Sequence, residues 1–125
     1  MNINNSLKID MYSWALFGLL WIILPKKLLS INFGNIEYDW ITVHMTQAFG
    51  LLCILSAYPS YISLKYNFND KQKRNTIKTK LIFELVLLLL MITANKKILP
   101  SHVRFGMFGL SLCILINLIT LYSKK

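Results

Sequence analysis

Residues Trp40–Leu64 read WITVHMTQAFGLLCILSAYPSYISL, and this stretch decides the fold. It holds no Asp, Glu, Lys or Arg, and as a helix it would exceed the roughly 30 Å of a bilayer's hydrocarbon core. It also contains His44, Gln47 and several small residues, which a helix surrounded only by lipid does not need. The stretch therefore predicts a membrane-spanning helix that packs against other helices.

Three more apolar stretches accompany it along the chain. Of the 125 residues, 55% are hydrophobic and 15% are charged, whereas about 25% are charged in an average soluble domain. Charged residues fall between the apolar stretches, and Pro25 closes the first of them. We expect one all-α domain over residues 1–125, in which four transmembrane helices form an up-down-up-down bundle. The expected spans cover about residues 11–29, 40–64, 77–95 and 103–122, with a polar loop at 65–80.

The net charge is +9, and the positions of the basic residues indicate how the chain is oriented in the membrane. Basic residues that flank apolar spans set membrane orientation and contact lipid headgroups, so we expect no nucleic-acid partner. With four spans, nine of the 14 basic residues would lie on the side that carries both termini. The excess predicts that the termini are cytosolic. We favour the endoplasmic reticulum or another endomembrane over the plasma membrane or the mitochondrial inner membrane.

Small residues mark two helix faces that would allow close packing. Four of them share one face of the second span, and a similar face lies on the fourth span. The two faces consist of Thr46, Gly50, Cys53 and Ala57, and of Gly106, Gly109 and Cys113. We expect spans 2 and 4 to pack against each other through them, with the two cysteines close together. In span 1, Trp14 and Trp21 share a face and are expected to be interfacial anchors, or else to line a cleft for lipid or an apolar ligand.

Glu84 is the most informative polar residue, because a charge inside a bilayer is costly and needs a partner. Lys80 lies one helical turn away, and Asn117 of the fourth span lies at a similar depth. The arrangement favours a structural Lys80–Glu84 pair. The alternatives are a carboxylate in a bundle cavity that binds a proton or cation, or a contact with a partner subunit. A second polar group at the opposite end comprises His44, Gln47 and Arg104.

Motifs for catalysis and metal binding are absent from the sequence. There is no HExxH, GxSxG or P-loop pattern, and neither Cys53 nor Cys113 belongs to a CxxC motif. Intramembrane chemistry normally needs at least two convergent groups. We therefore expect a protein that is not an enzyme and that uses no cofactor and no metal.

Three short motifs resemble the DoxX-like family of small four-helix membrane proteins. They are Leu24-Pro25, Phe33-Gly34 and the run QAFGLL at residues 47–52. The resemblance implies a four-helix membrane fold and carries over no functional residue, since Gln47 stands where a basic residue is expected. The chain is also similar in size to small multidrug transporters, but the apolar core of span 1 lacks their glutamate.

Three functions remain open at the level of sequence. The first is a non-enzymatic accessory or scaffolding subunit of a larger membrane complex, because short loops and packing faces suit docking to a partner. The second is a small oligomeric carrier or channel that uses Glu84. The third is a lipid-binding module that uses the Trp14/Trp21 face and the basic loop. The expected partners are membrane lipids and either a larger membrane protein or further copies of the chain.

Overall fold

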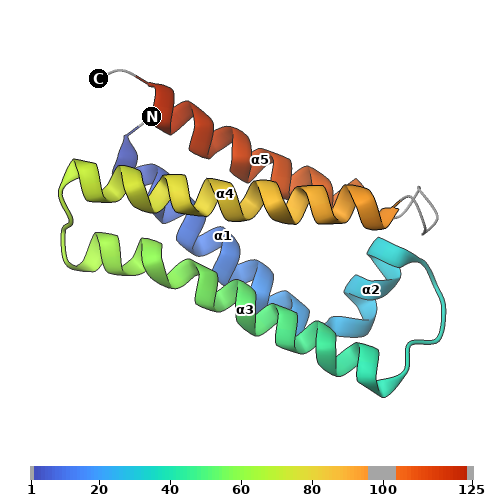
Figure 1. Ribbon diagram of the computed structural model, residues 1–125. Coiled ribbons are helices and arrows are strands. Elements are labelled where there is room, and N and C mark those ends of the chain that lie inside the picture. The colour runs from blue at the N-terminus through green and yellow to red at the C-terminus, as the bar shows by residue number, and fades with distance from the viewer. Residues whose placement is uncertain (1, 96–103, 124–125) are drawn as a thin grey trace.

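The computed structural model describes residues 2–95 and 104–123. Within them the chain forms five helices and no strand, which confirms the all-α prediction. Four long helices run side by side in alternating directions, and the short α2 lies at the end remote from the termini (Figure 1). The helices are α1 (Ile3–Ile23), α2 (Pro25–Phe33), α3 (Trp40–Lys65), α4 (Asp70–Asn95) and α5 (Arg104–Tyr122).

The first helix begins at Ile3, well before the predicted start of span 1. The Asn2 side chain caps it by accepting a hydrogen bond from the Asn4 amide at 3.0 Å. Its buried residues recur at intervals of three and four, which is the spacing of one helix face. They include Leu7, Asp10, Trp14, Gly18 and Trp21. The polar start of the chain is thus the first part of a core-forming helix.

Proline separates α1 from α2, so the predicted span 11–29 is divided. Pro25 cannot donate a backbone hydrogen bond, and it occupies the first position of α2. The next turn needs Gly34, whose φ of 99° is accessible to glycine. Tyr38 closes this turn, because its hydroxyl donates to the carbonyls of Leu29 at 3.1 Å and Gly34 at 2.6 Å.

The predicted polar loop at 65–80 is mostly helix, and that prediction is wrong. The connection between α3 and α4 spans only residues 66–69. Asn67, with a φ of 47°, ends α3 in a left-handed conformation that asparagine tolerates. Asn69 and Gln72 then start α4 with a reciprocal capping box, in which each side chain accepts from the other residue's amide at 2.9 and 3.1 Å. These local bonds let a strongly charged segment begin a helix.

The closest helix contact joins α1 and α3. A Cβ added to Gly18 would lie 2.5 Å from the Gly50 carbonyl oxygen, and one added to Gly50 would lie 2.7 Å from that of Gly18. Only glycine permits this approach. The predicted packing of spans 2 and 4 is wrong, because the described parts of α3 and α5 occupy diagonal corners of the bundle. Gly109 of α5 faces open space, since an added Cβ would meet no atom within 4 Å.

Both tryptophans of α1 lie in the interior, which corrects the prediction of interfacial anchors. Trp14 is 4% exposed and Trp21 is 7% exposed. The Trp14 ring packs against Phe17 and Phe83, with centroids 6.2 and 5.7 Å away. They lie inside because α1 turns its Gly18 face, which they share, toward α3.

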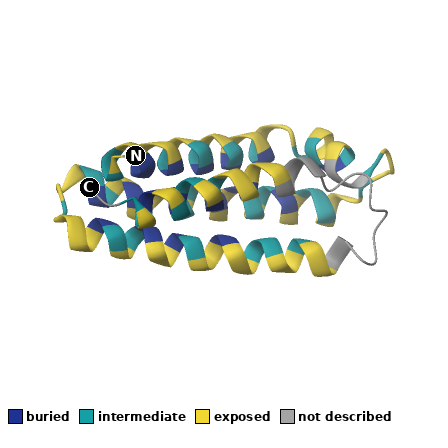
Figure 2. Ribbon diagram, turned by 90° about the horizontal axis from the view of Figure 1, so that it is seen from above, coloured by how far each residue is buried: buried dark blue, intermediate teal, exposed yellow. Residues whose placement is uncertain are grey.

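Apolar side chains cover the outside of the bundle, while polar ones share its interior. Figure 2 shows buried residues on the inward sides of the helices and exposed ones outside. The buried residues include nine hydrophobic and ten polar or charged side chains, and many large hydrophobic side chains are exposed. By length and composition, two of the described helices could cross a membrane, namely Ile3–Ile23 and Trp40–Lys65, and Phe108–Tyr122 is a shorter apolar helix.

The Gly18–Gly50 contact leads to a testable prediction. Gly18→Ala should lower the free energy of unfolding by about 1–3 kcal/mol, because the new methyl group overlaps the Gly50 backbone. Gly109→Ala is the matched control and should be neutral or gain up to about 1 kcal/mol in helix propensity. Denaturant titration in detergent micelles, followed by circular dichroism, measures both. Equal stability of the two variants would contradict this packing.

Candidate functional site

A buried ion pair joins the first and fourth helices. Lys80 Nζ of α4 lies 2.9 Å from Asp10 Oδ2 of α1, and the two side chains are only 6% and 5% exposed. Ser60 of α3 donates to the same Asp10 oxygen at 2.5 Å. Charged side chains are almost never this buried unless they are paired. Three helices therefore converge on one carboxylate.

Lys80 has two further partners that complete its environment. Its ammonium donates to the Ser56 carbonyl oxygen at 2.7 Å and lies 5.1 Å from the centre of the Trp14 ring. The cation is thus satisfied by a carboxylate, a carbonyl and an aromatic face.

Glu84 is fully buried, and its two oxygens accept from two different helices. Trp14 Nε1 donates to Oε1 at 3.2 Å, and Asn117 Nδ2 donates to Oε2 at 2.9 Å. Ser6 extends the network by donating to Asn117 Oδ1 at 3.5 Å. The expected Lys80–Glu84 pair is not formed, because Lys80 turns to Asp10. The structure does bring Glu84 together with Asn117, the depth-matched residue of the fourth span.

These contacts define the buried polar network, which comprises Asp10, Lys80, Glu84, Asn117 and Ser60. With both carboxylates ionised it carries one net negative charge. Both Glu84 oxygens meet N–H donors, an arrangement that suits a carboxylate. Asp10 Oδ1 is buried and has no hydrogen-bond partner among the described residues. The network can therefore hold helices together, and it also offers one free acceptor for a proton or a water molecule.

The other predicted polar residues lie away from this network. His44 is exposed, and its Nδ1 is 2.8 Å from the Trp40 carbonyl oxygen one turn earlier. Gln47 Nε2 donates to the Ile22 carbonyl of α1 at 3.1 Å, which ties α3 to the end of α1. The side chain of Arg104 and the surroundings of Gly106 lie outside the described part of the structure. Among the described packing residues, Thr46, Gly50, Cys53 and Ala57 are buried, and Cys113 is partly buried.

Asp10 and Ser60 are the network residues that the sequence interpretation missed. The first predicted span begins at about residue 11, which leaves Asp10 outside the membrane. A signal was present, because Asp10 continues the spacing of Trp14, Gly18 and Trp21 toward the N-terminus. In the same way, Lys80 and Glu84 continue the spacing of Lys73 and Ile77 on α4. Among the described residues, no group of three or more His, Cys, Asp or Glu side chains could hold a metal ion.

The Asp10–Lys80 ion pair leads to a second testable prediction. Lys80→Met should cost about 3–5 kcal/mol of unfolding free energy, because Asp10 is left buried without its counter-ion. The double variant Asp10→Asn/Lys80→Met should recover a large part of that loss, because the residual side chains are uncharged. Unfolding titrations of the single and double variants in detergent measure the coupling. Strictly additive losses would show that the pair is not energetically coupled.

Comparison with known proteins gives a single family. The model of a domain of unknown function, DUF8292, matches residues 1–123. No curated protein and no solved structure matches the chain. The similarity to DoxX-like proteins stays a prediction. The chain belongs to the DUF8292 family.

Proposed function

We propose that the chain is an integral membrane protein with four membrane-crossing passes, formed by α1, α3, α4 and α5. The observation that carries this proposal is the reversal of polarity between surface and interior. Large apolar side chains such as Met45, Leu52 and Leu55 are 62–70% exposed, whereas Asp10 and Glu84 are buried. In water such a surface favours association, whereas in a bilayer it is solvated by lipid.

Both of the longest helices are compatible with this arrangement. As 26-residue helices, α3 and α4 are each about 39 Å long, which exceeds the hydrocarbon thickness. Three charged residues of α4, namely Lys73, Lys80 and Glu84, are buried. Exposed lysines nearer the start of α4 extend to the headgroups. The termini and the 66–69 connection lie at one end of the bundle, which agrees with cytosolic termini (Figure 1).

Within the membrane, the function that the geometry favours is a non-enzymatic accessory or scaffolding subunit of a larger complex. The polar network is closed, since Glu84 is fully buried and Lys80 has its partners inside the bundle. Such a network fixes the relative positions of four helices. The outward apolar faces of α3 and α5 are then available to lipid and to the helices of a partner. This proposal assigns the buried charges to assembly of the bundle.

Purification from native membranes tests the accessory role. We expect the tagged chain to resist alkaline carbonate extraction and to co-purify in mild detergent with a larger membrane protein at fixed stoichiometry. The matched control is Gly18→Ala, which should weaken the bundle and reduce recovery of the partner. Recovery of a homodimer alone would overturn the accessory role, and release by carbonate would overturn membrane insertion.

A small proton carrier is the second candidate, and Asp10 is the observation that favours it. Two carboxylates and one lysine are buried together, and Asp10 Oδ1 has no partner among the described residues. Buried ionisable groups in a membrane are typical of proton pathways. In this function Glu84 and Asp10 would exchange a proton during transport.

Glu84→Gln separates the two functions, because it removes the charge and keeps the shape. If the chain is a carrier, proteoliposomes that contain a pH-sensitive dye should lose proton flux while the variant stays folded. In the accessory role, wild type and variant should show the same background flux, and the variant should lose stability or partner binding. Glu37→Gln is the control, since Glu37 is exposed and lies between α2 and α3. Flux that is abolished in Glu84→Gln alone would favour the carrier.

A further inference from the structure

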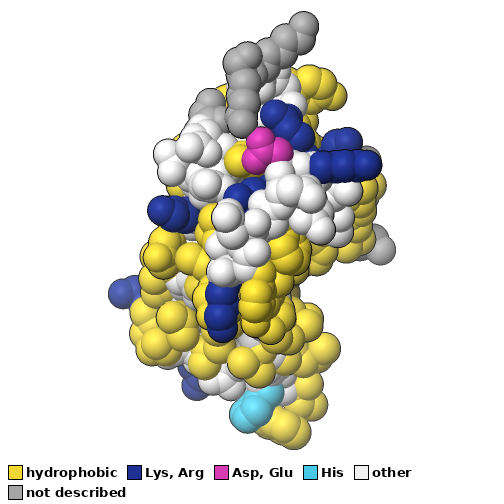
Figure 3. Space-filling view, turned by 90° about the vertical axis from the view of Figure 1, so that its left-hand side faces the viewer, with side chains coloured by type: hydrophobic (Ala, Val, Ile, Leu, Met, Phe, Trp, Pro, Cys, Tyr) yellow, Lys and Arg dark blue, Asp and Glu magenta, His cyan; other side chains and the backbone are white. Residues whose placement is uncertain are grey.

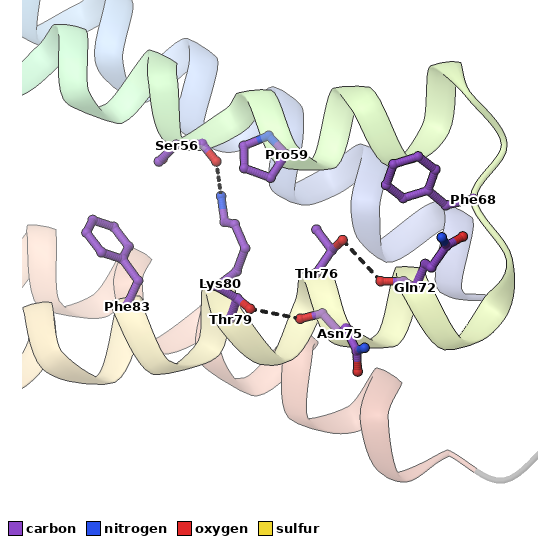
Figure 4. Close-up of a pocket in the computed structure, with 9 residues that line it drawn as sticks. All are labelled: Ser56, Pro59, Phe68, Gln72, Asn75, Thr76, Thr79, Lys80 and Phe83. Atoms are coloured by element: carbon purple, nitrogen blue, oxygen red, sulfur yellow. Dashed lines mark hydrogen bonds between the residues drawn. The ribbon is translucent and has the colours of Figure 1, made fainter.

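A groove opens between α3 and α4 near the end that carries the termini. Its volume is about 540 Å³, within the range of small-ligand sites. Figure 4 shows its walls, with Ser56 and Pro59 on α3, Phe68 in the connection, and residues of α4 facing them. Lys80 crosses its inner side to reach Ser56, so the groove ends against the buried polar network.

Uneven helix packing produces this groove. The glycine contact draws α3 toward α1, at the Gly18–Gly50 approach. The α3–α4 pair has no such approach at the level of Lys80, whose long side chain bridges the space. Lys80 spans it to the Ser56 carbonyl, whereas nearer the connection the short side chains of Thr76 and Ser63 meet with 2.9 Å between their hydroxyl oxygens. A side opening between two helices of a membrane bundle faces lipid.

The groove changes in polarity along its length. Toward the 66–69 connection it is lined by Gln72 and Asn75, and the Gln72 side chain points toward Phe68 (Figure 4). Deeper in the bundle it is lined by Phe83, Pro59 and the carbon chain of Lys80. Polar residues at one end and apolar surface at the other match an amphipathic ligand whose head lies near the connection.

Positive charge surrounds the polar end. Lys71 and Lys78 are exposed on α4 beside the groove face. In the end-on view, Lys and Arg side chains lie around acidic surface at this end of the bundle (Figure 3). Each lysine near a membrane surface adds attraction for anionic lipid. The charge on this end therefore selects a negative head.

We propose that the α3–α4 groove binds one anionic phospholipid. Its phosphate would lie at the Gln72 end of the groove, within reach of Lys71 and Lys78, and an acyl chain would lie along Phe83. Lys80 contributes the wall of the groove rather than a phosphate contact, because its ammonium is held by Asp10 and Ser56. The proposal rests on membrane insertion of the chain. It also replaces the sequence-based hypothesis that lipid binds to the Trp14/Trp21 face, because both tryptophans are buried.

Spin-labelled lipids test the proposal in phosphatidylcholine vesicles that contain the purified full chain. Wild type should immobilise phosphatidylglycerol severalfold more strongly than phosphatidylcholine. The double variant Lys71→Gln/Lys78→Gln should abolish that preference, because each lysine near the surface contributes up to about fivefold in affinity for anionic lipid. Lys26→Gln/Lys27→Gln changes the same charge on exposed residues of α2 and should keep the preference. Equal losses in both doubles would overturn the site in favour of diffuse attraction.

A second variant tests the groove independently of charge. Thr79→Trp places a large ring in the groove and keeps every lysine, so it should remove the phosphatidylglycerol preference. An unchanged preference would overturn the assignment to this groove. Flotation and carbonate extraction of the same vesicles separate the two proposals. A chain that does not insert overturns both, whereas an inserted chain with no lipid preference overturns only the groove.

Discussion

The ion pair between Asp10 and Lys80 is the interaction on which the rest of the interior depends. It joins α1 to α4, and Ser60 and the Ser56 carbonyl bring α3 into the same contact. A buried charge that loses its partner destabilises a protein far more than an ordinary lost contact. The relative positions of these three helices are therefore tightly constrained at this level. Glu84 then connects α4 to α1 through Trp14 and to α5 through Asn117.

The close packing of α1 against α3 explains why the groove lies between α3 and α4. Gly18 and Gly50 allow α1 and α3 to approach until their backbones are almost in contact. No comparable pair of glycines joins α3 to α4, so the long side chain of Lys80 bridges a wider space to Ser56. The same fold thus has a tight helix pair and a grooved one. This asymmetry explains why the candidate ligand site lies beside the polar network instead of inside it.

Much of the architecture could be predicted because a long apolar stretch without charged residues is a strong signal of a helix. The helical class and the position of α3 follow directly from the stretch that begins at Trp40. The start of α4 could not be predicted from composition, because its lysines are typical of a loop and only the capping bonds of Asn69 and Gln72 reveal a helix start. Asp10 was missed for a related reason, since a polar tail and the polar face of a helix have similar compositions.

The sequence by itself determined that the chain is helical, that its helices are largely apolar, and that Glu84 needs a partner. It did so because helix periodicity and the cost of a buried charge are local properties of each segment. Only the tertiary structure decided which partners are used: Lys80 turns to Asp10, and the small residues of α3 pack on α1. Several helices offered small faces and polar groups of suitable depth. The physical reason is that pairing depends on the simultaneous fit of four helices, which no single stretch of sequence contains.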